Sequence, residues 1–152
     1  MTMAPEEQAE RAAVVAEART WLGTRFHHEA DVKGGGVDCA MLLVRCFVDT
    51  GILAPFDPRP YPIHWHLHQT EERYLSWLAK FAYPTDNPQP GDVVIWRVGN
   101  TFSHAAIVSV WPRVIHAYSP AGGVEESDIS LTGPLNNARH ARRYFSKWGK
   151  PE

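Results

Sequence analysis

Cys39 stands where the sequence changes from glycines to an apolar helical pattern. Three glycines and Val37 precede Asp38 and Cys39, and the apolar run Ala40–Leu43 follows. Asp is a favoured N-cap residue, so we expect a helix to begin at Cys39. The unpaired N–H groups and the positive dipole end at a helix start favour a thiolate, the reactive form of cysteine. The position therefore predicts a nucleophilic thiol.

A cysteine nucleophile needs a base, and two histidines on expected neighbouring strands are the candidates. His104 opens one of these strands, and His116 lies within the next. A three-residue turn, 110–112, would place His116 opposite Ala106, with His104 about 7–8 Å away on the same face. A turn one residue longer or shorter would put the two histidines on opposite faces. The strand register therefore tests whether the two histidines act together.

We predict that Cys39, His104 and His116 are the catalytic residues. Residues close to them in the sequence are the candidates for binding the substrate or the oxyanion of the reaction: Asp38, Gly36, His27 and Ser103.

Each candidate also has an ordinary structural interpretation. Cys39 shares one helical face with Leu42, Leu43, Cys46 and Phe47, and a cysteine there is most often a small buried hydrophobe. Cys46, in the middle of the helix, is given only that role. A strand histidine with apolar neighbours is commonly a buried residue with a satisfied hydrogen bond. Glycines, a capping acid, a first-turn cysteine and two strand histidines all fit one mechanism, so we favour the catalytic interpretation.

A trio of histidines, His64, His66 and His68, alternates with Trp65 and Leu67. On an extended chain this spacing places three imidazoles on one side, which is a conceivable zinc site. The trio precedes a helical pattern rather than a second group of ligands, and the sequence has no Cys-x-x-Cys. A structural or substrate-groove role is therefore favoured, and we expect no metal and no cofactor.

The periodicity of the chain predicts helices first and short strands afterwards. The expected helices cover 6–22, 38–50 and a segment that ends near Phe81, and the expected strands cover 93–96, 103–110, 114–118 and about 138–145. Loops rich in glycine or proline are expected over 24–36, 54–62 and 83–90, with turns at 99–100 and 111–113. This order predicts an α+β fold, with N-terminal helices packed on a short antiparallel sheet.

The totals limit the class of protein. The length of 152 residues fits a single domain over 1–152, with flexible ends expected at 1–5 and 149–152. A formal net charge of −2 gives no electrostatic argument for nucleic acid. The acidic N-terminus is not a secretory signal, and no window is apolar enough to span a bilayer, so we expect synthesis in the cytoplasm. The basic residues Arg139, Arg142, Arg143 and Lys147 predict a solvated edge or, alternatively, a docking surface for an acidic partner.

Five segments of the chain resemble the NlpC-type cell-wall cysteine peptidases of bacteria and phages, which have a papain-like fold. The segments are Trp21–Thr24, Gly36–Ala40, Pro90–Val94, Ser103–Val108 and Val114–Ala117. The resemblance implies that Cys39 is the nucleophile, that His104 is its base and later the acid, and that His116 orients His104. It also implies hydrolysis of amide bonds in the peptide stem of peptidoglycan, with the backbone N–H of Cys39 as an oxyanion donor.

A finer resemblance concerns the tails of phages. The glycines at 34–36, together with Trp65–His68 before Glu71–Tyr74, resemble the subgroup encoded with tail proteins of phages and phage-derived gene-transfer particles. This implies tail-tip or hub proteins as partners, and incorporation into a virion-like particle that acts at the cell wall. The chain departs from the family at Phe26, where members often carry a tyrosine. The alternative is a non-catalytic structural or docking module of a tail tip.

Overall fold

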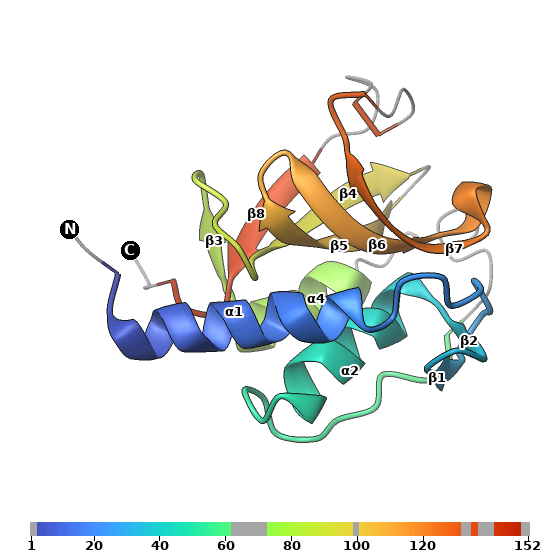
Figure 1. Ribbon diagram of the computed structural model, residues 1–152, viewed down its shortest axis with the longest axis horizontal. Coiled ribbons are helices and arrows are strands. Elements are labelled where there is room, and N and C mark those ends of the chain that lie inside the picture. The colour runs from blue at the N-terminus through green and yellow to red at the C-terminus, as the bar shows by residue number, and fades with distance from the viewer. Residues whose placement is uncertain (1–2, 62–72, 99–100, 132–134, 137–141, 150–152) are drawn as a thin grey trace.

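The described part of the protein has two layers, with three helices on one face of a six-stranded antiparallel sheet (Figure 1). The computed structural model describes residues 3–61, 73–98, 101–131, 135–136 and 142–149. The helices are α1 (Pro5–Arg19), α2 (Cys39–Asp49) and α4 (Arg73–Phe81). The strands of the sheet, in spatial order, are β3 (Tyr83–Thr85), β8 (Arg142–Ser146), β4 (Val93–Val98), β5 (Thr101–Val110), β6 (Arg113–Tyr118) and β7 (Gly123–Asp128). The predicted α+β class is confirmed.

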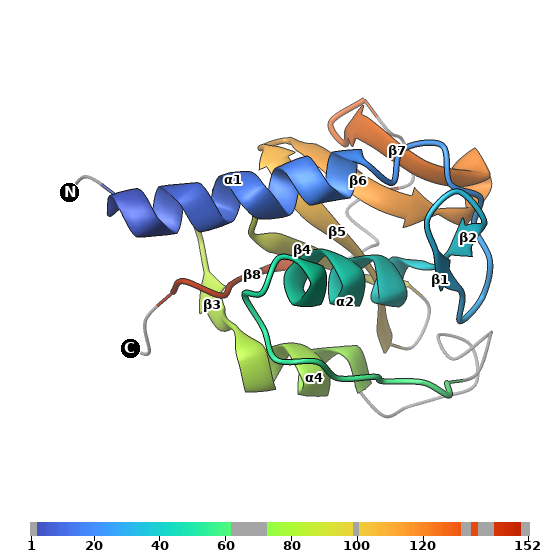
Figure 2. The same ribbon diagram turned by 60° about the horizontal axis from the view of Figure 1, so that its bottom comes forward.

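A small ladder of β1 (Asp31–Val32) and β2 (Gly36–Val37) lies beside the N-terminal end of α2 (Figure 2). Figure 2 also shows α1, α2 and α4 side by side across the sheet. A short 3-10 turn, η1 (Ser119–Ala121), connects β6 to β7. Isolated bridges pair Arg25 with Gly123 and Phe26 with Val37, so the loop before α2 lies beside the connection between β6 and β7.

Two apolar clusters pack on the two faces of the central strands. The larger cluster lies between the sheet and the helices and includes Ala105 and Ile107 of β5. The smaller cluster lies on the other face and includes Ala106 and Val108 of the same strand, together with Trp96 of β4. Successive side chains of a strand point to opposite faces, and residues 105–108 of β5 follow this alternation.

Helix α2 begins at Cys39, as predicted, because Asp38 caps it. Its carboxylate Oδ1 accepts a hydrogen bond from the backbone N–H of Met41 at 2.9 Å. The apolar residues that follow are buried in the larger cluster, and the helix ends at Asp49. Gly51 has a φ of 78°, which suits the left-handed backbone that often terminates a helix.

The register between β5 and β6 is the one that the sequence predicts, although the turn is different. Ile107 pairs with Ile115 and Val108 with Val114, which places His116 opposite Ala106. The predicted three-residue turn is wrong, because Val110 pairs with Arg113 and only two residues form the turn. The ladder shifts between Val108 and Val110, so Ser109 is the extra residue of a β-bulge. A two-residue turn plus a one-residue bulge gives the same offset as a three-residue turn.

Several predicted boundaries are wrong for local reasons. Helix α1 ends at Arg19 rather than at residue 22, because residues 20–22 form i to i+3 hydrogen bonds and Gly23 has a φ of 85°. At its other end, Pro5 belongs to the helix rather than to a flexible end, and proline suits the first helical turn. The predicted loop over 24–36 contains β1 and the start of β2. The predicted loop over 83–90 begins with β3, an edge strand, where a proline is tolerated.

The C-terminal half of the sheet also differs from the prediction. The last strand is β8, which covers Arg142–Ser146 rather than 138–145. Strand β7 is missing from the prediction, and it pairs with β6 over six residue pairs, from Arg113 with Asp128 to Tyr118 with Gly123. Its sequence, Gly-Val-Glu-Glu-Ser-Asp, contains one large apolar residue, so it carries little of the pattern that marks a strand.

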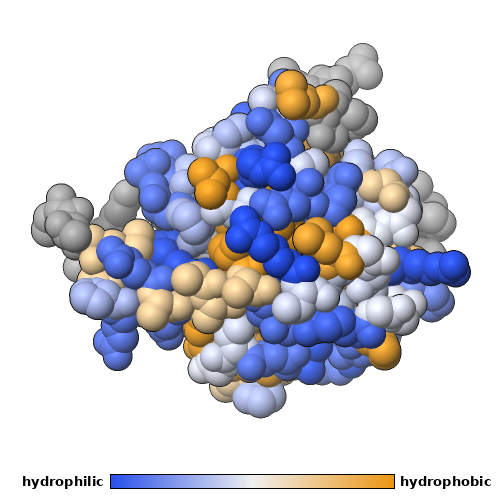
Figure 3. All heavy atoms as spheres, viewed as in Figure 1, coloured by the Kyte–Doolittle hydropathy of each residue, from blue (hydrophilic) through white to orange (hydrophobic). Residues whose placement is uncertain are grey.

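Some predictions fall outside the described residues. These are the histidine trio at 64, 66 and 68, the turn at 99–100 and the basic residue Arg139. Within the described residues, none of the helices has both the length and the apolar character needed to cross a membrane. Figure 3 shows hydrophilic and hydrophobic residues intermingled on the face of the molecule that carries α1.

Candidate active site

Cys39 lies in the first turn of α2, and its thiol reaches the start of β5. The sulfur is 3.6 Å from the backbone carbonyl oxygen of Ser103, which accepts its hydrogen bond and directly precedes His104. Cys39 keeps 8% of its surface exposed, whereas Cys46 on the same helix is fully buried. Burial raises the pKa of the Cys46 thiol. Cys46 is therefore a core residue, while Cys39 lies beside the strand that carries a histidine.

The carboxylate of Asp38 holds the start of α2 in place through three donors. Besides the bond from Met41 to Oδ1, its Oδ2 accepts the backbone N–H of Glu29 at 2.7 Å and the hydroxyl of Tyr61. Burial, and then the neighbouring Asp38 carboxylate, raise the pKa of Tyr61, so its hydroxyl stays protonated and donates. Asp38 is predicted to contact substrate or oxyanion. In the structure both of its carboxylate oxygens accept hydrogen bonds from the loop before α2, from the helix and from Tyr61.

Tyr61 comes from the proline-rich segment after α2 and was not a candidate in the sequence analysis. It is 5% exposed, and its ring contacts His28 and Trp77. The backbone carbonyl of Tyr61 accepts from Nε2 of His28 at 2.9 Å. Tyr61 therefore links His28, in the loop before β1, to Asp38, the N-cap of α2. Phe26, which has no hydroxyl, packs against the larger apolar cluster.

His104 and His116 form a hydrogen-bonded pair, as the predicted register requires. Nε2 of His104 lies 2.8 Å from Nδ1 of His116. The ring of Tyr118 stacks on His116 at a centroid distance of 4.8 Å and also contacts His104, at 5.3 Å. On the other strand neighbouring β5, Trp96 pairs with His104 and its ring lies 5.4 Å away. Aromatic rings on two sides thus fix the orientation of the imidazole pair.

The thiol and the imidazole pair approach the start of β5 from different sides. Both histidines lie on the face that carries Trp96, whereas Cys39 comes from α2 on the other face. Trp96 pairs with His104 and Arg97 with Phe102, so Ser103 is the extra residue of a bulge at this point. Bulges bend a strand and redirect its side chains, and they are common next to active sites. The bond donated by the thiol goes to the Ser103 carbonyl, and catalytic hydrogen bonds often tighten only when substrate binds.

A carboxylate on β7 completes the chain of polar groups behind His104. Oε1 of Glu125 lies 3.1 Å from Nε2 of His116, and Glu125 is its direct cross-strand partner. Burial lowers the pKa of both histidines. The neighbouring His116 lowers the pKa of His104 further, whereas Glu125 raises the pKa of His116 and offsets part of the effect of burial. Sequence analysis missed Glu125 because it missed the strand.

The other predicted binding residues lie around the loop before α2. Gly36 is buried, and a Cβ atom there would come within 2.9 Å of the Cβ of His27, so the close approach of these two residues requires glycine. His27 is exposed, and its Nδ1 lies 3.1 Å from the carbonyl oxygen of His28. Ser103 is buried and contributes its backbone carbonyl to the thiol. The buried residues near Cys39 are therefore Gly36, Asp38 and Ser103. His27 is exposed to solvent.

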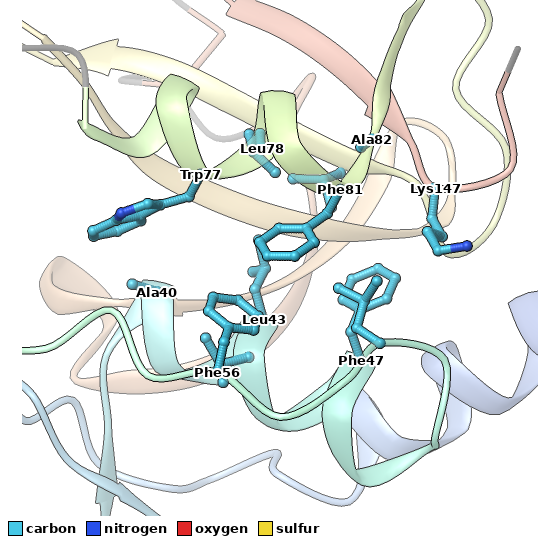
Figure 4. Close-up of a pocket in the computed structure, with 12 residues that line it drawn as sticks. Ala40, Leu43, Phe47, Phe56, Trp77, Leu78, Phe81, Ala82 and Lys147 are labelled. Atoms are coloured by element: carbon cyan, nitrogen blue, oxygen red, sulfur yellow. The ribbon is translucent and has the colours of Figure 1, made fainter.

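An apolar pocket between α2 and α4 is separate from these polar groups (Figure 4). In Figure 4, Trp77 and Phe81 of α4 face Leu43 and Phe47 of α2 across it. Apart from Lys147, its described lining residues are uncharged, so it offers little for amide chemistry. Among the described residues, no three His, Cys, Asp or Glu side chains are grouped as a metal site requires.

The chain was compared with curated proteins and with solved structures. Among curated proteins, none matches the chain. Among solved structures, it is similar to the NlpC/p60 domain of the peptidoglycan hydrolase SagA, with a TM-score of 0.59 and 19% identity over 88% of this chain and 96% of that one. RipB, a peptidoglycan hydrolase of Mycobacterium tuberculosis, gives a TM-score of 0.59 and 16% identity over 97% of this chain and 70% of that one.

NlpC2 of Trichomonas vaginalis gives a TM-score of 0.65 and 13% identity over 93% of this chain, which spans 47% of that protein. These likenesses confirm the papain-like fold that the resemblance implies. The model of the NlpC/P60 family matches residues 21–143, a stretch that contains Cys39, His104 and His116. Since that match covers most of the sequence, the chain belongs to the NlpC/P60 family.

Proposed function

We propose that the protein is a cysteine peptidase that hydrolyses amide bonds in the stem peptides of peptidoglycan. In this proposal Cys39 is the nucleophile, His104 is the general base and acid, and His116 orients His104. The observation that carries it is the thiol at the start of α2, bonded to the carbonyl beside His104, whose imidazole is held by His116. This is the nucleophile, base and orienting group that thiol catalysis needs.

The proposed reaction assigns one task to each group. When substrate binds, the thiol of Cys39 exchanges its bond to Ser103 for one to His104. The S–H proton moves to Nδ1 of His104 while sulfur forms a bond to the amide carbon, and the carbonyl electron pair moves to oxygen. The C–N bond then breaks, and His104 gives its proton to the leaving amine. Water attacks the thioester, His104 takes a proton from the water, and the released thiolate recovers that proton.

The start of α2 supplies stabilisation for both charged species. The helix dipole favours the thiolate of Cys39, and backbone N–H groups of a first turn are available to an oxyanion. The Asp38 carboxylate binds the N–H of Met41. We assign the oxyanion to the backbone N–H of Cys39, because that donor belongs to the same residue as the attacking sulfur. The buried cap network keeps this donor in a fixed direction.

Peptidoglycan is the substrate that the family relationship favours. SagA and RipB, which share the fold, are named as peptidoglycan hydrolases. The role in a phage or gene-transfer tail rests on the sequence resemblance at 34–36 and 65–74. In that role the chain is made in the cytoplasm, joins tail-tip or hub proteins and opens the cell wall locally. Mass spectrometry of purified tail particles tests this part, and particles without the chain would refute it.

The hydrolase proposal is tested by incubating purified murein with the wild-type protein, with Cys39→Ala and with Cys46→Ala. The wild type and Cys46→Ala should release stem peptides that mass spectrometry detects, and Cys39→Ala should release none. Equal release by Cys39→Ala would refute the assignment of the nucleophile. A non-catalytic docking module would release nothing in any variant, and iodoacetamide near neutral pH would not label Cys39 ahead of Cys46.

A further inference from the structure

Glu125 and His104 bind opposite nitrogens of the same imidazole. Nδ1 of His116 lies 2.8 Å from Nε2 of His104, and Nε2 of His116 lies 3.1 Å from Oε1 of Glu125. The three residues come from neighbouring strands, β5, β6 and β7, so the line of contacts crosses the sheet in one direction. A bond between two imidazoles needs one nitrogen with a proton and one without, and the distance alone does not decide which.

The carboxylate of Glu125 determines which nitrogens of His116 and His104 carry protons. Carboxylate oxygens only accept hydrogen bonds, so Nε2 of His116 carries a proton. A neutral imidazole has one N–H, which makes Nδ1 of His116 an acceptor. Nε2 of His104 must then donate, and Nδ1 of His104 keeps a lone pair. That lone pair is the one able to take a proton from a thiol.

The other groups around His116 do not impose this arrangement. The hydroxyl of Ser127 lies 3.4 Å from Nε2 of His116, and a hydroxyl either donates or accepts. Tyr118 stacks on the face of the ring at an interplanar angle of 11°, away from its nitrogens. Among the described contacts of His116, Glu125 is therefore the group that selects one tautomer.

We propose that Glu125 is a positioning residue that sets the tautomers of His116 and His104 and thereby makes Nδ1 of His104 the base for Cys39. The inference rests on the proposed function of the same site. Glu125 does not touch the substrate or the reacting sulfur. Its negative charge also offsets the cost of the imidazolium that forms on His104, in surroundings where burial lowers the pKa of both histidines.

The first test measures the tautomers in the wild-type protein, at neutral pH, by long-range 1H–15N NMR correlation of the two imidazoles. We expect a proton on Nε2 of each ring and a bare Nδ1 on each. A proton on Nδ1 of His104 would overturn the proposal. This measurement needs no activity, so it remains decisive if the protein fails to cleave murein; in that case the proposed function fails and the proton arrangement stands.

The second test compares Glu125→Gln with Glu126→Gln. Glu126 is the next residue of β7 and faces the other way, where it bonds Arg19 at 3.1 Å, so its change is a matched control. A glutamine at 125 both donates and accepts, so the NMR signals should show a mixed or reversed pair of tautomers. The Glu125→Gln change removes the negative charge behind His116 and His104. It should lower the rate of Cys39 alkylation at pH 7 by about tenfold and shift the midpoint of its pH profile to higher pH.

Glu126→Gln should match the wild type in both measurements. If Glu125→Gln keeps wild-type tautomers and the wild-type alkylation profile, the proposal is wrong. If both glutamine variants show the same loss of rate with unchanged tautomers, a general effect of charge or stability explains the result, and the positioning role of Glu125 is equally refuted.

Discussion

Replacing Tyr61 with phenylalanine tests the network that holds the start of α2. The hydroxyl of Tyr61 is one of three donors to the buried carboxylate of Asp38, beside the N–H groups of Glu29 and Met41. Phenylalanine keeps the ring contacts with His28 and Trp77 and removes only the hydroxyl. A hydrogen bond to a charged group contributes about 1.5–3 kcal/mol, and a charge that loses a buried partner adds to the cost.

Two bonds to Asp38 remain in this variant, so we expect a loss of about 2 kcal/mol in the free energy of unfolding. For a chain of this size that loss corresponds to a fall in Tm of roughly 4–8 °C. Urea unfolding followed by circular dichroism measures it. Tyr83→Phe is the control, because Tyr83 is 40% exposed at the edge of the sheet and its change should cost less than about 0.5 kcal/mol. Equal stability of the two variants would refute the role given to the Tyr61 hydroxyl.

Three further outcomes are expected from urea unfolding. Asp92→Ala should cost about 2–3 kcal/mol, since it removes the buried carboxylate 2.8 Å from the guanidinium of Arg11, which keeps the part-exposed carboxylate of Glu7 at 2.9 Å. Gly123→Ala should cost about 1–3 kcal/mol or more, because its Cβ would lie 2.2 Å from the backbone oxygen of Thr24. The pKa values of His104 and His116 are lowered in the folded state. The contribution of these neutral rings to the free energy of unfolding is therefore complete above about pH 6.5 and is lost as the pH falls toward the folded-state pKa values. The loss is up to about 1.4 kcal/mol per pH unit for each ring. A free energy of unfolding that stays constant from pH 7 to 5 would contradict this last expectation.

The parts of the site that sequence reasoning could predict depend on local rules. Asp38 caps α2 because its short carboxylate reaches an N–H two or three residues ahead, and this needs no knowledge of the rest of the fold. The apolar spacing after Cys39 likewise predicts the burial of Leu42, Leu43, Cys46 and Phe47, although Ala40, Met41 and Val44 on the other sides of the helix are buried as well. His104 and His116 lie in apolar, β-branched runs, so their strands are visible in the sequence.

The parts that could not be predicted are contacts between distant segments. Tyr61 reaches Asp38 from a proline-rich stretch without regular structure, and nothing in its neighbours marks a buried hydroxyl. The position of the thiol on the Ser103 carbonyl depends on a bulge in β5, which no local pattern announces. Both contacts join segments that are distant in the sequence, so they depend on the packing of the whole chain.

Glu125 is an intermediate case, because a turn signal for it exists in the sequence. The residues after Tyr118 read Ser-Pro-Ala-Gly-Gly, a cluster typical of a tight connection, and Gly122 has a φ of 84°. Every pair between β6 and β7 keeps one register, from Tyr118 with Gly123 onward, so a residue two places after Gly123 must face the residue two places before Tyr118. Those residues are Glu125 and His116. A strand identified by its turn, rather than by its few apolar residues, would therefore have made Glu125 a candidate neighbour of His116, and the register of the ladder then makes it the direct partner.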